Sequence, residues 1–138
     1  MHDDPTGWPT GRLLSAAARR VERRWDAYLD QFSLSHASVP VLAMLARGDL
    51  SQRELADAMG VTEQTVSRML VRLERNGYVR RAPHARDRRR HVVSLAESGR
   101  EVLVRLQESP TVRDMSVEGL TAEEVAGLRA GLLAMLKE

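Results

Sequence analysis

Residues 51–77 read "SQRELADAMGVTEQTVSRMLVRLERNG", and this stretch decides the fold. Its first four letters, from Ser51, form a capping-box pattern, in which a serine hydroxyl and a glutamate carboxylate satisfy the free amides at a helix start. Gly60 then interrupts the apolar periodicity with the residue type that enters the left-handed region without steric cost. Thr62 predicts the N-cap of a second helix, which Asn76 and the following glycine end. The stretch therefore predicts helix, tight turn, helix, which is the supersecondary form of a helix-turn-helix.

The second predicted helix carries a polar face opposite an apolar one. In helix-turn-helix modules this helix enters the major groove of DNA with its N-terminal residues on the base edges. Glutamine can bond adenine at two atoms, arginine can do the same with guanine, and a threonine methyl can touch thymine. We expect the DNA-contacting side chains of this helix to be Thr62, Gln64, Thr65, Ser67, Arg68 and Arg72. Helix spacing alone leaves open the alternative that they are ordinary solvated residues.

A strongly basic segment, "RRAPHARDRRRHVVSL", follows at residues 80–95. Tyr78–Ala82 and His91–Leu95 are predicted as short strands, with Pro83–Arg90 as the loop between them. Such a loop suits a phosphate backbone or a narrow minor groove, and its arginines are Arg86, Arg88, Arg89 and Arg90. Charge that served only solubility would not explain why it lies between two strands directly after a helix-turn-helix. The expected fold is therefore mainly α with a small β-hairpin wing (α+β), a winged helix-turn-helix.

The distribution of charge favours a polyanionic partner. Residues 47–91 carry eleven arginines and six acids, whereas residues 1–46 balance five against five and residues 92–138 are net acidic. Every basic residue except Lys137 is arginine, whose planar fork suits phosphate and guanine. We therefore expect double-stranded DNA as the partner.

Amphipathic helices are predicted on both sides of this lobe. Apolar positions at steps of three and four predict a long helix over Arg12–Phe32 and a second over Ser35–Arg47, in which Pro40 should remove one backbone bond and bend the helix slightly. Beyond the wing, one helix is expected over Glu97–Glu108, and a capping-box pattern at Thr121 opens the last helix. A chain of 138 residues would struggle to bury the apolar stripes of its first and last helices against its own core. These stripes predict a homodimer, with packing inside one chain as the alternative.

These motifs resemble those of the MarR family of bacterial transcription regulators. The resemblance rests on "LSQRELADAMGVTEQTVSRMLVRLERNGYVRR" and on "DRRRHVVSLAESG", while the flanking helices fit in length and order. The wing signature is carried by Asp87, Arg89, Leu95 and Gly99. The resemblance implies a homodimer that binds a pseudo-palindromic operator, usually as a repressor that a small molecule releases. It also implies that Arg68 is the recognition-helix arginine, that Arg89 reaches the minor groove, and that Asp87 braces the wing by pairing with a neighbouring arginine.

Two positions depart from the pattern of the family. The family usually has a threonine after the wing leucine, where this chain has Ala96, so the cap of the next helix is expected to move to Ser94 or Ser98. Pro110 is expected to break the fifth helix, which is usually long in the family.

Three parts are expected along the chain: an arm and dimerisation helix over residues 1–34, a DNA-binding lobe over residues 35–99, and dimerisation helices over residues 100–138. The predicted function is a sequence-specific, ligand-responsive transcriptional repressor. Three alternatives stay open: an activator that uses the same lobe, a sequence-independent DNA-compacting protein, and a ligand-sequestering or protein-interaction module that kept the fold. Uncharged side chains beside Arg68 favour base reading over compaction.

The expected effector is a small aromatic or anionic molecule, in line with the resemblance. The residues suited to border its site are Trp8, Arg12, Trp25 and His36. Core packing is the alternative role for Trp25, and a surface position is the alternative for the others.

Other classes of chemistry find no support in the sequence. It holds no cysteine, which excludes disulfides, thiolate metal sites, cysteine catalysis and thiol-based redox sensing. No nucleophile elbow, phosphate loop or metal-helix motif indicates an enzyme, and no cofactor is expected. The spacing of His84, Asp87 and His91 resembles no common metal site. No apolar run approaches the roughly 18 residues of a membrane helix, and no signal-peptide core follows the N-terminus, so we expect a soluble cytoplasmic protein.

Overall fold

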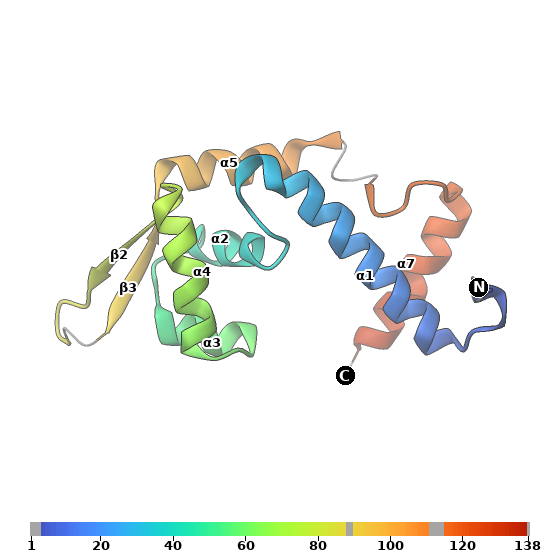
Figure 1. Cartoon of the computed structure of the whole chain (residues 1–138), viewed down its shortest axis with the longest axis horizontal. Coiled ribbons are helices and arrows are strands. Elements are labelled where there is room, and N and C mark those ends of the chain that lie inside the picture. Colours follow the sequence, from blue (N-terminus) through green and yellow to red (C-terminus); the bar gives the residue numbers. More distant parts are fainter. Residues whose placement is uncertain (1–3, 88–89, 111–114, 138) are drawn as a thin grey trace.

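The structure, a computed structural model, describes residues 4–87, 90–110 and 115–137 of the chain. Figure 1 shows β2 and β3 projecting at one end of the molecule, beside α2, α3 and α4, while α5 runs above them and α1 and α7 extend towards the other end. The helices are α1 (Thr10–Leu29), α2 (Ser38–Leu45), α3 (Gln52–Met59), α4 (Glu63–Arg75), α5 (Glu97–Glu108) and α7 (Ala122–Leu136), and the strands are β1 (Leu50–Ser51), β2 (Val79–Pro83) and β3 (His91–Leu95). The predicted class, mainly helical with a small β part, is confirmed.

The helix-turn-helix forms as the sequence predicts. The Ser51 hydroxyl accepts the amide of Glu54 at 3.0 Å, and the Glu54 carboxylate accepts the amide of Ser51 at 3.1 Å. Gly60 ends α3 in the left-handed conformation, with φ of 66°. The Thr62 hydroxyl then accepts the amide of Thr65 at 3.1 Å and caps α4. Each cap satisfies amides that the first helical turn leaves without a partner.

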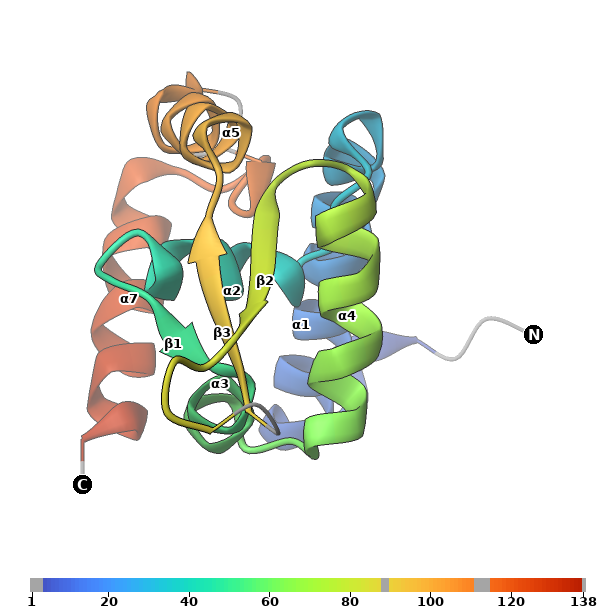
Figure 2. The same cartoon turned by 90° about the vertical axis from the view of Figure 1, so that its left-hand side faces the viewer.

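The sheet has three strands in the order β1–β3–β2, all antiparallel. The predicted hairpin is confirmed, although its first strand covers Val79–Pro83 and so lies one residue further along than expected. The third strand, β1, was not predicted: Leu50 pairs with the buried Val93. A strand of two residues shows no alternation and lies directly before a helix cap, so the sequence pattern does not reveal it. In Figure 2 the sheet lies beside α4, with α3 at its lower end.

An aliphatic core holds the lobe together. Its fully buried members are Leu29, Val41, Leu42, Leu45, Leu55, Val66, Leu70, Leu73, Val79 and Val93. Burial of each such side chain contributes about 1.5–3 kcal/mol. Three of them lie at steps of four and three along α4, which fixes the opposite face of that helix towards solvent.

The junction between α1 and α2 differs from the prediction. The first helix ends at Leu29 and continues as a single 3-10 turn over Asp30–Phe32, where Ser33 closes it with φ of 57°. The second helix begins at Ser38, three residues later than predicted. Pro40 is therefore the third residue of α2, where the amide has no partner within the helix in any case. The expected loss of a helical bond at Pro40 was wrong.

The start of α5 also differs from the prediction. Ala96 is the N-cap and provides no side-chain bond, while Ser94 lies in β3. Ser98 lies inside the helix, and its hydroxyl donates to the carbonyl of Gly77. The predicted transfer of the cap to Ser94 or Ser98 was therefore wrong. The end of α5 at Glu108, ahead of the proline, agrees with the prediction.

Helix α7 has no buried residue in the single chain. Its capping box at Thr121 is formed as predicted, yet its leucines face outwards, with Leu133 55% and Leu136 78% exposed. Arg24 of α1 reaches the segment before α7, where it lies 3.5 Å from Glu118. Among the residues described, no helix combines the length and the apolar character needed to cross a membrane.

Candidate nucleic-acid interface

The outward face of α4 carries the polar side chains that the sequence singled out. Gln64, Thr65, Arg68 and Arg72 are exposed, and Ser67 is half-buried. The buried side chains on the opposite face fix this orientation. A helix presented in this way fits the major groove of B-DNA, which is about 12 Å wide.

The hydroxyl groups of the two threonines at the start of α4 take part in hydrogen bonds that cap the helix. The Thr62 hydroxyl accepts the amide of Thr65, and the two hydroxyls lie 3.0 Å apart. Thr62 therefore acts as the cap, and the methyl group of Thr65 is the part that is best suited to a base contact. Glu63 beside them brings a carboxylate to the helix start, where it is favourable to the helix dipole.

Arg68 and Arg72 also border a cavity of about 220 Å³ between α4 and the turn that leads into α2. Its other lining residues are Ser33, Ser35, Ser38, Met69 and Leu73. The two arginines thus lie where the recognition face meets the α1–α2 junction.

The wing loop is closed by bonds within itself. The His84 amide donates to the Arg90 carbonyl at 2.8 Å, and the Arg90 amide donates to the Asp87 carbonyl at 3.0 Å. The amide of Arg86 donates to the imidazole Nδ1 of His84 at 3.1 Å. Arg86 and Arg90 are exposed. Arg88 and Arg89, which the sequence also assigns to the interface, lie outside the described residues.

Asp87 lies beside an arginine of the same loop. Its Oδ2 is 3.8 Å from Nε of Arg90, at the distant end of the range for an ion pair. Both residues face a cavity of about 270 Å³ that also borders Ser51, Gln52, Arg53, Glu63 and His91. The wing loop therefore turns towards the starts of α3 and α4.

The Ser51 amide and then its hydroxyl hold the pKa of Glu54 below its ordinary value, with a smaller contribution from the positive charge of Arg90.

Sequence reasoning missed Gln52 and Arg81, which connect the wing to the helices. Arg81 is half-buried, whereas its neighbour Arg80 is exposed. The carboxylate of Glu74 accepts the amide of Arg81 at 3.1 Å and lies 3.6 Å from its Nε. Strand alternation is the signal that could have found Arg81, because Val79, two residues earlier, points into the core.

The four residues expected to border an effector site lie in two separate places. Arg12 places its guanidinium 3.8 Å from the centre of the Trp8 ring at the start of α1. Trp25 stacks on Tyr28 at 5.9 Å near the other end of that helix. Arg12 and Trp25 are about 20 Å apart along the helix axis, given the rise per residue. They do not line one cavity in the single chain.

The fourth of these residues, His36, binds Asp26 of α1. Its amide donates to Oδ1 at 2.7 Å, and its Nδ1 lies 2.9 Å from the same oxygen. The backbone bond is the largest of the effects that hold the pKa of Asp26 below its ordinary value.

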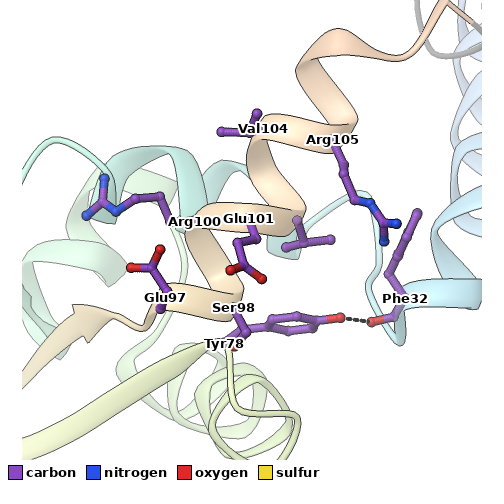
Figure 3. Close-up of a pocket in the computed structure, with 9 residues that line it drawn as sticks. Phe32, Tyr78, Glu97, Ser98, Arg100, Glu101, Val104 and Arg105 are labelled. Carbon is purple, nitrogen blue, oxygen red and sulfur yellow. Dashed lines mark hydrogen bonds between the residues drawn. The ribbon is translucent and has the colours of Figure 1, made fainter.

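A cavity of about 690 Å³ lies against α5 on another side of the lobe. Figure 3 shows Tyr78 beneath the helix, with its hydroxyl donating to the carbonyl of Phe32, at 2.6 Å. The residues that line the cavity are Phe32, Tyr78, Glu97, Ser98, Arg100, Glu101, Val102, Val104 and Arg105. Partial burial raises the pKa of Tyr78. Nothing in the sequence pattern pointed to this cavity.

Within the described part of the chain, no group of three or more His, Asp or Glu side chains is arranged to hold a metal ion.

Comparison with known proteins gives a consistent result. A family model described as "MarR family" matches residues 32–90. The chain is 28% identical over 123 residues to the multiple antibiotic resistance protein MarR of Salmonella typhimurium, with 87% of this chain and 85% of that protein covered. It is 38% identical over 106 residues to an uncharacterized HTH-type transcriptional regulator of Bacillus cereus, covering 76% and 70%. A mutant of Escherichia coli MarR solved in complex with operator DNA is similar at a TM-score of 0.75 and 27% identity, covering 98% of this chain and 100% of that one.

Proposed function

The chain belongs to the MarR family of transcription regulators, and we propose that it binds a pseudo-palindromic operator as a homodimer and represses the genes beside it. Members of this family are transcription regulators, not enzymes. The observation that carries the proposal is the exposed polar face of α4, with Gln64, Arg68 and Arg72, next to a basic wing. This is the arrangement with which a winged helix reads a major groove while its wing follows the backbone. A similar chain has been solved with operator DNA.

The assignment of DNA binding and dimerisation to separate segments of the chain is also a proposal. We assign DNA binding to residues 35–99, and dimerisation to residues 1–34 and 100–138. Support comes from α7, whose leucines are exposed in the single chain. Exposed apolar surface of this kind marks a protein interface, and a two-fold partner would cover it while matching the symmetry of a palindromic operator.

Base contacts in this proposal come from Gln64, Thr65, Ser67, Arg68 and Arg72, with Thr62 as the cap that fixes the helix start. The wing contacts come from Arg86, Arg88, Arg89 and Arg90, and Asp87 braces them. The uncharged members of the first group favour sequence reading over compaction, because charge alone would need no amide or methyl group at base edges.

Repression is proposed to respond to a small aromatic or anionic effector. Because the sequence has no cysteine, this response uses no thiol chemistry. Two places support it: the cavity beside Tyr78, which Phe32 of the 3-10 turn after α1 lines, and the junction at which His36 binds Asp26 of α1. An effector releases DNA only if it binds the DNA-incompetent conformation more tightly. A protein with this function works in the cytoplasm, where the chromosome is.

Selection of bound sites from a random DNA library tests the proposal. We expect a palindromic consensus whose half-sites lie about one helical turn apart. Binding without enrichment of any sequence would replace the proposal with sequence-independent compaction, and absence of binding would reject both. A reporter gene placed behind the selected site then separates repression from activation.

A further inference from the structure

We propose that Arg81 and Gln52 are positioning residues, which hold the wing in a fixed place relative to the recognition helix α4. In this way they set how sharply the protein distinguishes its operator from related sequences. The inference rests on the proposed DNA-binding function.

Arg81 ties the wing to the end of α4. It lies in the middle of β2, opposite the buried Val93. The Glu74 carboxylate near the C-terminus of α4 accepts the amide of Arg81 at 3.1 Å and lies 3.6 Å from its Nε. A carboxylate that holds both the backbone and the side chain of one residue fixes its position and its orientation. The wing strand therefore cannot slide along α4 without breaking both contacts.

Gln52 connects the same guanidinium to the other end of α4. Nη1 of Arg81 donates to Oε1 of Gln52 at 3.5 Å, and Nε2 of Gln52 donates to the carbonyl of Glu63 at 3.4 Å. Glu63 is the first residue of α4. Each bond is long and therefore weak, but together they complete a path from Glu74 through Arg81 and Gln52 to Glu63. This path starts and ends on the recognition helix and passes through both the wing and α3.

The position of the pair within the fold makes it suited to this role. The side chain of Arg81 is 20% exposed, so its charge is screened less than that of a surface arginine. The wing and α4 are proposed to contact different parts of the duplex, and a supporting contact that is loose by about 1 Å weakens the geometry of a binding site. The adjacent Arg80 points the other way and is exposed, which makes it a matched control with the same charge in the same strand.

The test uses the full-length protein and the operator that it selects. Fluorescence anisotropy measures Kd for the operator and for a duplex with one base pair changed in each half-site, at several salt concentrations. The variants are Arg81→Gln, Gln52→Ala and the control Arg80→Gln, with folding checked by circular dichroism. The measure of specificity is the Kd for the changed duplex divided by the Kd for the operator. We expect Arg81→Gln to lower this ratio on the order of fivefold. Gln52→Ala should also lower it, and Arg80→Gln should leave it unchanged.

The ratio separates positioning from plain stability, because a smaller folded fraction weakens binding to both duplexes equally. The inference is overturned if Arg81→Gln gives the same ratio as Arg80→Gln. It is also overturned if Arg81→Gln only flattens the salt dependence by about one contact, because Arg81 would then touch a phosphate. If Arg81→Gln does not fold, Gln52→Ala decides alone, since Gln52 lies at the helix start and not in the core. Failure of the wild type to select any consensus rejects the proposed function, and the positioning role with it.

Discussion

The amide of His36 and its imidazole Nδ1 lie 2.7 and 2.9 Å from the same carboxylate oxygen, Oδ1 of Asp26. This contact joins α1 to the turn that leads into α2, and so links the helix proposed for dimerisation to the DNA-binding lobe. The backbone bond from His36 is the main cause that holds the pKa of Asp26 below its ordinary value of 3.8.

The first prediction concerns the free energy of unfolding of Asp26→Asn against pH. Because the pKa of Asp26 is lower in the folded chain, its carboxylate stabilises the fold above the unfolded pKa, and this stability is lost as pH falls through the folded pKa. We expect the variant to be less stable than wild type at about pH 6, with a difference that shrinks below about pH 4. Urea unfolding at one fixed protein concentration measures it. Asp30→Asn is the control for loss of one carboxylate, and a difference that is constant over the whole pH range would contradict the prediction.

The second prediction concerns Arg68, which is exposed on the outward face of α4. Arg68→Ala should weaken operator binding by about 1–3 kcal/mol and relax the preference at one position of each half-site. Repeated site selection with the variant measures both. Arg75→Ala is the matched control, because Arg75 is exposed on the same helix but close to its C-terminal end. Uniformly weaker binding with an unchanged consensus would reassign Arg68 to a phosphate.

The third prediction tests the join between the wing and α5. A side chain at Gly99 would meet the carbonyl of Tyr78 and the side chain of Leu95, and backbone cannot move aside cheaply. Gly99→Ala should therefore lower the free energy of unfolding by about 1–3 kcal/mol. Gly11→Ala has nothing within 4 Å, and we expect it to change stability by less than about 1 kcal/mol. Equal effects of the two substitutions in a urea titration would contradict the close approach.

The local features of the chain could be predicted from the sequence because each depends on a few neighbouring residues. The capping boxes at Ser51 and Thr121, the left-handed Gly60 and the two wing strands all belong to this kind. The strand at Leu50 could not be predicted, since it exists only through its pairing with Val93.

The same reason explains the missed contacts of the candidate site. The hydroxyl of Ser98 has two possible uses, a helix cap or a bond to Gly77, and only the packed wing decides for the second. Arg81 is one of six arginines between residues 80 and 90, and what distinguishes it is a carboxylate seven residues earlier that the fold brings back to it. The proposed effector residues failed to meet because Arg12 and Trp25 lie far apart on one rigid helix.

The fourth prediction concerns Arg89 of the wing, which the family resemblance assigns to the minor groove. Arg89→Ala should weaken operator binding and reduce the slope of log K against log salt by about one contact, because one fewer phosphate-bound counterion is released. Binding titrations at four or more salt concentrations measure the slope. Arg80→Ala, which removes the same charge from the outer side of β2, is the control. A slope identical to that of wild type would remove Arg89 from the DNA interface.

The last prediction concerns the exposed apolar side of α7. Leu128 and Leu132 are one turn apart and are 43% and 36% exposed in the single chain. If a second copy covers them, Leu132→Asp buries an unpaired charge in the interface, which costs several kcal/mol. We expect the wild type to be a dimer and the variant a monomer at micromolar concentration in size-exclusion chromatography with light scattering. Operator binding should fall at least about tenfold, because the two DNA-binding lobes are no longer joined and each half-site is then bound independently.

The control for this substitution lies on the same helix. Arg129 is exposed and already charged, so Arg129→Glu should leave the dimer intact. Binding of Leu132→Asp to a single half-site should match that of wild type, because the substitution lies outside the lobe. Were the variant to stay dimeric, the apolar side of α7 would not be the dimer interface. If half-site binding were lost as well, the substitution would have unfolded the lobe. The measurements of oligomeric state and of binding to the palindromic operator would then be repeated with Leu128→Asp, one turn earlier on the same side.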